Sequence, residues 1–225
     1  MGGVFYALMA VSGGLATLAR RGLIVGGDAA TTAANILAHQ SMYLLGFAGD
    51  VLVVASYLAV TALFYRMLKP VSRSISLTAA FFSLMGCAIM GFALTFQLAP
   101  LTVLGNAAYL GVFTVEQLHA LAYMFLKLYS QAYGVALVFF AFYGVLTGYL
   151  AFKSTFLPRI VGGSMMLAGL SWLTFLSPPF AAKYFHYLLA FAAGEALFAL
   201  WLLVKGVDAE RWTQRAAAAR MAEPF

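Results

Sequence analysis

The sequence predicts an all-α protein, a polytopic transmembrane helix bundle, and two observations lead to this. The chain is 64% hydrophobic and only 9% charged, and its mean hydropathy is +0.94, whereas soluble domains carry about 25% charged residues. Hydrophobic runs separated by charges, prolines and polar loops approach the roughly 20 residues that a helix needs to cross a bilayer. In lipid, helices satisfy their own backbone hydrogen bonds, so a helix bundle is expected.

Dividing the chain at these breaks gives about six spans. They are expected near residues 4–18, 41–64, 77–98, 131–152, 160–176 and 183–205. Asp28 is placed to cap a short helix between the first two spans. Pro100, Gly105 and Asn106 are expected to break the helix after the third span, and residues 101–113 then form either a loop or a re-entrant turn. The bundle is expected to occupy residues 1–206, followed by a short charged tail at 207–225.

Two features of the chain between residues 114 and 152 concern a single long helix. Residues 114–134 show amphipathic helical spacing and lead without a proline into the fourth span. Gly144 and Gly148 within that span form a GxxxG pattern, which lets another helix approach closely. The amphipathic helix is therefore expected to lead into the fourth span, and the glycine pattern either marks a close helix contact or is a chance occurrence in an apolar segment.

The positive charges indicate orientation. The net charge is +6, but the Lys and Arg residues stand at the ends of hydrophobic runs and form no basic block interleaved with aromatics. A nucleic-acid partner is therefore not expected. Basic turns at 66–73 and 153–159, together with the basic tail, fall on one side of a six-span bundle. The positive-inside rule makes that side cytoplasmic, so both termini are expected in the cytoplasm and the protein in the cell inner (cytoplasmic) membrane, as a multi-pass protein.

Asp50 and Glu195 are the carboxylates that lie deep within predicted spans. A charged side chain at the bilayer centre costs about 3 kcal/mol on insertion scales, so each is expected to have a partner, a proton or a wet cavity. Gly49 and Gly194 directly precede them and would allow a neighbouring helix or ligand to come close. Two interpretations stay open: a proton-binding or cation-binding pair near mid-membrane, and a structural hydrogen bond between helices.

Other candidate sites are weaker. Glu116 and His119 have the Glu-x-x-His spacing of di-iron bundles, but such sites need a second pair and further carboxylates, so no metal site is expected. Haem ligation by two of the three histidines, His39, His119 and His186, would require their helix ends to converge. Cys87 is expected to be a buried structural thiol. Because no catalytic motif is found, the sequence favours a protein that is not an enzyme and identifies no cofactor.

Four pieces of the chain resemble a known family. They are GDAATTAANI at 27–36, LKPVSR at 68–73, FLPR at 156–159 and the closing run from Gly194-Glu195 to LWLLVKGV at 200–207. With these pieces the chain resembles the bacterial membrane family of domain of unknown function 4386. The resemblance implies a multi-span inner-membrane protein and carries over no activity and no binding residues.

The favoured function is a multi-pass integral membrane protein that binds or moves a small or lipophilic ligand through a polar centre at Asp50 and Glu195. The alternative is a non-catalytic transmembrane subunit that packs into a larger membrane complex through its small-residue faces. The expected partners are the lipid bilayer and either other membrane proteins or further copies of this chain. The identity of the ligand does not follow from the sequence.

Overall fold

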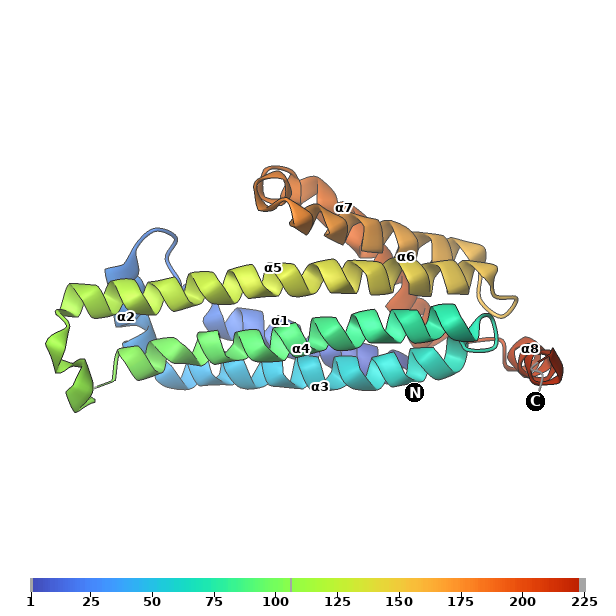
Figure 1. The fold of residues 1–225 in the computed structure, drawn as a ribbon, viewed down its shortest axis with the longest axis horizontal. Coiled ribbons are helices and arrows are strands. Elements are labelled where there is room, and N and C mark those ends of the chain that lie inside the picture. The colour runs from blue at the N-terminus through green and yellow to red at the C-terminus, as the bar shows by residue number, and fades with distance from the viewer. Residues whose placement is uncertain (1, 106, 223–225) are drawn as a thin grey trace. The chain divides into compact units, whose positions relative to one another are not determined.

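The computed structural model of the chain describes residues 2–105 and 107–222, excepting the side chains of 2, 178, 182, 185, 186, 188–190, 192 and 222. Within these residues the chain is helical and no strand occurs, so the predicted all-α class is confirmed. The helices are α1 (Gly2–Arg20), α2 (Ala29–Ala38), α3 (Gln40–Leu68), α4 (Arg73–Val103), α5 (Val115–Lys153), α6 (Arg159–Trp172), α7 (Pro178–Val204) and α8 (Ala209–Ala222), with short 3-10 turns η1 (Ala108–Val112) and η2 (Leu173–Leu176) (Figure 1).

Five stretches of the described residues are helical, long and apolar enough to cross a membrane. They are Gly3–Arg20, Gln40–Leu68, Arg73–Val103, Val115–Lys153 and Arg159–Leu176. Large apolar side chains such as Leu15, Phe92 and Ile160 are 60%, 63% and 74% exposed on these helices. A helix that is apolar on its outer as well as its inner face is suited to lipid. These helices indicate a membrane location.

The region predicted as the sixth span is also helical. α7 is 27 residues long. Part of its first half lies outside the described side chains, and the apolar helical stretch found among its described residues is the shorter segment Ala193–Val204. α5, at 39 residues, forms the unbroken helix expected from residue 114 onward. At about 1.5 Å per residue α5 is roughly 58 Å long, well beyond a hydrocarbon layer of about 30 Å.

The chain divides into two compact units. Unit 1 consists of Met1–Ala7, Ser56–Cys87 and Gly134–Phe225, and unit 2 consists of Leu8–Ala55 and Ala88–Tyr133.

In unit 2 the short helix α2 has the cap that the sequence predicts. The Asp28 side chain accepts hydrogen bonds from the Thr31 amide at 2.9 Å and the Thr31 hydroxyl at 2.6 Å. The Gly27 amide donates to the Tyr123 hydroxyl of α5 at 2.7 Å. This hydrogen bond attaches the loop that precedes α2 to helix α5. Beneath this loop a buried apolar cluster forms from Leu23, Ile36, Tyr43 and Leu126. The connection between α1 and α3 is therefore a folded cap on this end of unit 2.

In unit 1 helices α5 and α6 pack with their backbones nearly in contact. A Cβ built on Gly148 would lie 2.5 Å from the amide nitrogen of Met166, and one on Gly144 would lie 3.1 Å from the Cα of Gly169. From the other side, a Cβ on Gly162 would lie 2.3 Å from the amide nitrogen of Phe152. The expected close approach at the GxxxG pattern is confirmed, and its partner is α6.

α8 is fixed to the two basic turns of unit 1. The Trp212 indole Nε1 donates to the Met67 carbonyl at 2.9 Å, at the end of α3. The Asp208 amide donates to the Phe156 carbonyl at 3.2 Å, in the turn before α6. The two basic turns and the tail thus lie at one end of unit 1, and their assignment to the cytoplasm stays a prediction.

The prediction that Pro100 ends the third span is wrong. α4 continues through Pro100 to Val103, and the Leu104 amide donates to the Pro100 carbonyl at 2.9 Å. A proline removes its own amide hydrogen bond and crowds the carbonyl four residues earlier, which weakens or bends a helix but does not necessarily end it, and helices in membranes tolerate it. The segment that follows contains the 3-10 turn η1, with Leu110 buried and Val112 82% exposed; Asn106 lies outside the described residues.

Candidate functional site

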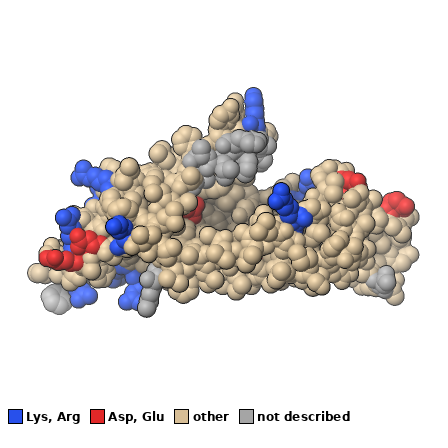
Figure 2. Space-filling view, turned by 180° about the vertical axis from the view of Figure 1, so that it is seen from behind, with Lys and Arg blue, Asp and Glu red and all other residues tan. Residues whose placement is uncertain are grey.

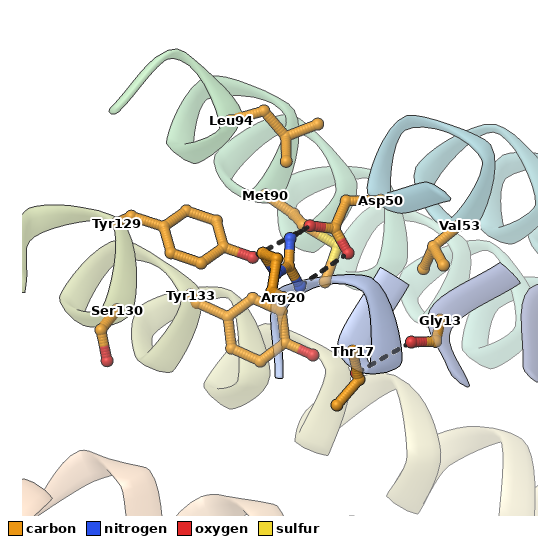
Figure 3. A pocket seen from close by; sticks show the side chains of 10 residues that line it. All are labelled: Gly13, Thr17, Arg20, Asp50, Val53, Met90, Leu94, Tyr129, Ser130 and Tyr133. Carbon is orange, nitrogen blue, oxygen red and sulfur yellow. Dashed lines mark hydrogen bonds and ion pairs between the residues drawn. The ribbon is translucent and has the colours of Figure 1, made fainter. Parts of the chain in front are cut away.

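An ion pair joins α1 to α3 in unit 2. Arg20, the last residue of α1, donates through Nη1 to Asp50 Oδ2, and its Nη2 lies 3.4 Å from Asp50 Oδ1. The Tyr129 hydroxyl of α5 lies 3.5 Å from the same Oδ2 (Figure 3). Both charged side chains are 16% exposed. Asp50 therefore has the partner that its depth requires, and that partner is a cation.

Small residues bring the two charged groups together. A Cβ on Gly46 of α3 would lie 2.8 Å from Arg20 Cγ, and one on Gly49 would lie 2.8 Å from Ala16 Cβ and 3.1 Å from the Ser12 carbonyl. The absence of side chains at these positions lets α1 lie directly on α3. Arg20 can then extend its stem over Gly46 to Asp50, one helical turn further along α3.

The ion pair lines a pocket of about 300 Å³ in unit 2. Its wall combines the two charges, hydroxyl-bearing side chains and an apolar part, namely Gly13, Thr17, Arg20, Asp50, Val53, Met90, Leu94, Tyr129, Ser130 and Tyr133. Figure 3 shows the Tyr129 and Tyr133 rings beside Arg20, with Val53 across the ion pair from them and Leu94 above it in this view. Thr17 is already satisfied, because its hydroxyl donates to the Gly13 carbonyl at 2.8 Å. The pocket can thus offer both signs of charge and an apolar surface to one small molecule.

Glu195 lies in unit 1 with a different kind of partner. The Tyr6 hydroxyl of α1 donates to Glu195 Oε1 at 2.7 Å. The Tyr6 ring stacks on Phe64 at 5.8 Å between centroids, and Phe64 meets Phe198 at 5.5 Å. Glu195 itself is partly buried. The hydrogen bond between Tyr6 and Glu195 thus lies next to a cluster of aromatic rings.

Close packing also surrounds Glu195. A Cβ on Gly194 would lie 2.2 Å from the Ser164 carbonyl, so α7 touches α6 here. The Ser164 hydroxyl lies 3.3 Å from the Gly194 carbonyl, to which it donates. A Cβ on Gly3 would lie 2.6 Å from Leu203 Cα, so the start of α1 lies directly on the end of α7. Tyr6 follows Gly3 by three residues, about one turn of α1, and its hydroxyl reaches Glu195.

The glycines before both carboxylates allow a neighbouring helix to come close, as the sequence predicts. Asp50 and Glu195 belong to different units, and each has its own hydrogen-bonding partner. A single polar centre shared by the two stays a prediction. Sequence reasoning missed both Arg20 and Tyr6. The glycine spacing at 46 and 49 was the available signal for Arg20, and no pattern pointed to Tyr6.

The weaker candidates are placed as follows. Glu116 is exposed at the start of α5 and His119 is partly exposed. The His39 ring nitrogen Nδ1 lies 3.1 Å from the Asn35 carbonyl at the end of α2, and the His186 side chain lies outside the described residues. Among the described residues no three His, Cys, Asp or Glu side chains gather to hold a metal ion.

The chain is similar to one known protein and to one protein family. The chain is 25% identical over 158 residues to an uncharacterized protein of the archaeon Archaeoglobus fulgidus. The aligned region covers 70% of this chain and 82% of that protein. No solved structure matches the chain. The family model described as Domain of unknown function (DUF4386) matches residues 1–206, nearly the whole helical part of the chain, and the protein therefore belongs to this family.

Proposed function

We propose that the protein binds a small or lipophilic ligand, and moves it, with Asp50 and Glu195 as the groups that act on the ligand or on a coupled ion. The observation that carries this proposal is the open pocket beside the Arg20–Asp50 pair. Ion pairs are poor devices for stability in an apolar surrounding, because well-packed apolar residues often do as well or better. An ionisable pair that lines an open volume within a span is a functional-site hypothesis by default.

The chemistry of the pocket favours a ligand that carries both a donor and an acceptor. A simple cation would have to compete with Arg20 for Asp50, and a simple anion would have to compete with Asp50 for Arg20. A zwitterionic or strongly dipolar head group can instead add to both charges without separating them. Val53, Met90 and Leu94 offer contact to a short apolar tail. The class that fits best is therefore a small amphipathic molecule with a zwitterionic or neutral polar head.

Glu195 has a separate role in this proposal, the uptake of a proton or cation. Its hydrogen bond from Tyr6 comes from a neutral hydroxyl, so the bond leaves the charge of an ionised carboxylate uncompensated. A carboxyl at this depth is therefore suited to bind and release a positive ion as the protein changes state. Glu195→Gln keeps the shape and hydrogen-bonding capacity of the side chain and removes its titration.

The test is ligand binding by the full-length protein in nanodiscs. Norleucine, hexylamine and hexanoate serve as a matched zwitterionic, cationic and anionic set, and calorimetry measures binding at several pH values. We expect saturable binding of the zwitterion that is lost in Asp50→Asn. The control is Asp28→Asn, which makes the same chemical change at an exposed helix cap where Asn serves equally well. Equal binding by wild type and Asp50→Asn would show that the pocket is not the site.

The role of Glu195 is tested separately. Glu195→Gln is expected to fold normally and to lose any proton dependence of binding or movement. If it behaves as wild type while Glu195→Leu fails to fold, the Tyr6–Glu195 contact is structural only. The subunit alternative is decided by native mass spectrometry of protein extracted gently from its own membranes. A large hetero-assembly would favour the alternative, and a single chain or small homo-oligomer with a retained small molecule would favour ligand binding.

A further inference from the structure

A second pocket in unit 1 lies between the end of α3 and α8. Its volume is about 290 Å³, and it is lined by residues that include Tyr65, Arg66, Lys69, Trp212, Ala216 and Arg220. α3 is one of the helices long and apolar enough to cross a membrane, and the pocket adjoins its last turn. The pocket thus lies where a spanning helix would leave the hydrocarbon. Interfacial Tyr and Trp residues, as found here, are typical of this depth.

The wall formed by α8 is held in place. The Trp212 indole donates to the Met67 carbonyl at 2.9 Å, and Arg211 Nη1 donates to the Thr155 carbonyl at 3.3 Å. Arg211 also pairs with Asp208 at 3.3 Å. Trp212, Ala216 and Arg220 recur at intervals of four residues, so they share one face of α8. Because Ala216 is small, that face leaves room for a ligand between Trp212 and Arg220.

Three cationic side chains line this pocket, and none of them has an acidic partner in the part of the chain that the structure describes. Among the described residues Arg66, Lys69 and Arg220 make no hydrogen bond or ion pair. The two acids in the described part of the tail are engaged elsewhere, since Asp208 pairs with Arg211 and Glu210 accepts from Gln214 at 3.3 Å. Figure 2 shows several Lys and Arg side chains, with some Asp or Glu side chains among them, at the end of unit 1 that carries α8. Three like charges around one hollow repel one another, and an anion in the hollow relieves that repulsion.

We propose that this pocket binds a phosphate group, with Arg66, Lys69 and Arg220 as its ligands. Two guanidinium groups can each hold phosphate oxygens through paired donors, and the Lys69 ammonium adds a point charge. The group belongs either to the head of an anionic phospholipid or to a soluble phosphate ester. Basic pockets between helices at the cytoplasmic side of a membrane are suited to lipid head groups. This inference does not depend on the ligand proposed for the Asp50 pocket, since the two pockets share no residue.

The experiment titrates full-length protein in a neutral detergent with phosphatidylglycerol and, separately, with phosphatidylcholine, and native mass spectrometry counts the bound lipid. We expect tighter binding of phosphatidylglycerol, weakened about fivefold by either Arg66→Gln or Arg220→Gln and about 25-fold by both together. Ala216→Leu fills the hollow without changing the charge and is expected to abolish binding. Arg215→Gln is the matched control, because it removes an exposed charge from the same helix outside the pocket.

A competition with inorganic phosphate and glycerol phosphate distinguishes the two sources. If phosphatidylglycerol binds and millimolar glycerol phosphate does not displace it, the ligand is a lipid head group; if glycerol phosphate displaces it, the site takes a soluble ester. The proposal is overturned if the double variant binds phosphatidylglycerol as tightly as wild type. It is also overturned if Arg215→Gln weakens binding as much as Arg66→Gln, because the attraction would then be diffuse. Circular dichroism of each variant establishes that it is folded.

Discussion

The Arg20–Asp50 pair allows a quantitative prediction. Arg20→Gln and Asp50→Asn each leave one charge without its partner in a pocket where the side chains are 16% exposed. Loss of one partner from a fully buried pair costs about 3 to 5 kcal/mol. Because the remaining charge here can reach the open pocket, we expect each single change to cost about 2 kcal/mol. The double variant retains two neutral amides and should also cost about 2 kcal/mol, which gives a coupling energy of about 2 kcal/mol.

The assay is equilibrium unfolding in mixed micelles of increasing SDS content, followed by far-ultraviolet circular dichroism. A double-mutant cycle on Asp208 and Arg211 is the control, because these side chains are 46% and 66% exposed at an ion-pair distance of 3.3 Å. Exposed pairs of this kind couple by about 0.3 kcal/mol. If the Arg20–Asp50 cycle is additive to within this control value, the pair does not hold α1 to α3, and the account of Asp50 given above is refuted.

Three further changes follow from the packing and the caps. Gly49→Val should destabilise the protein by about 2 kcal/mol because its Cβ meets Ala16 at 2.8 Å, whereas Gly91→Ala, with no atom within 4 Å, should stabilise it by about 0.5 kcal/mol; SDS unfolding measures both. Gln97→Met should be neutral or stabilising by about 1 kcal/mol in the same assay, because the buried side-chain amide of Gln97 has no hydrogen-bond partner in the described structure. A clear loss of stability would mean that a bound molecule forms hydrogen bonds with this amide. Hydrogen bonds from the Thr31 hydroxyl and amide hold the pKa of Asp28 below its usual value. The contribution of Asp28 to stability is therefore present above its pKa in the unfolded chain and is lost as the pH falls through its pKa in the folded protein. An NMR titration should show the lowered pKa of Asp28, and Thr31→Ala should raise that pKa.

The sequence predicted the helices well because hydropathy and helix length act locally. Asp28 as a cap, the unbroken helix from residue 115 and the close packing at Gly144 and Gly148 all follow from residues that are neighbours in the chain. The error at Pro100 has a local cause as well. A proline disturbs the turn before it without necessarily ending a helix in a membrane, and the sequence does not show that α4 continues to Val103.

The partners of the two carboxylates could not be predicted in the same way. Arg20 meets Asp50, and Tyr6 meets Glu195, only because particular helices lie side by side. The rotation of one helix against another depends on where small residues fall along both, as Gly49 and Ala16 do here. A sequence shows such residues on each helix separately, and it does not show which helix of several will be the neighbour.

The positive-inside rule treats every Lys and Arg at a span end alike, and the structure separates them. Arg20 and Arg211 are each tied to a carboxylate and, in the case of Arg211, to a backbone carbonyl. Arg66 and Arg220 have no such partner among the described residues, although they line one pocket from helices far apart in the sequence. Orientation requires only that the charges stay on their side of the membrane. A variant in which the positive charge is moved from Arg220 to a neighbouring exposed position of α8 should therefore keep the orientation of the protein in the membrane. The same variant should lose phosphate binding in the pocket.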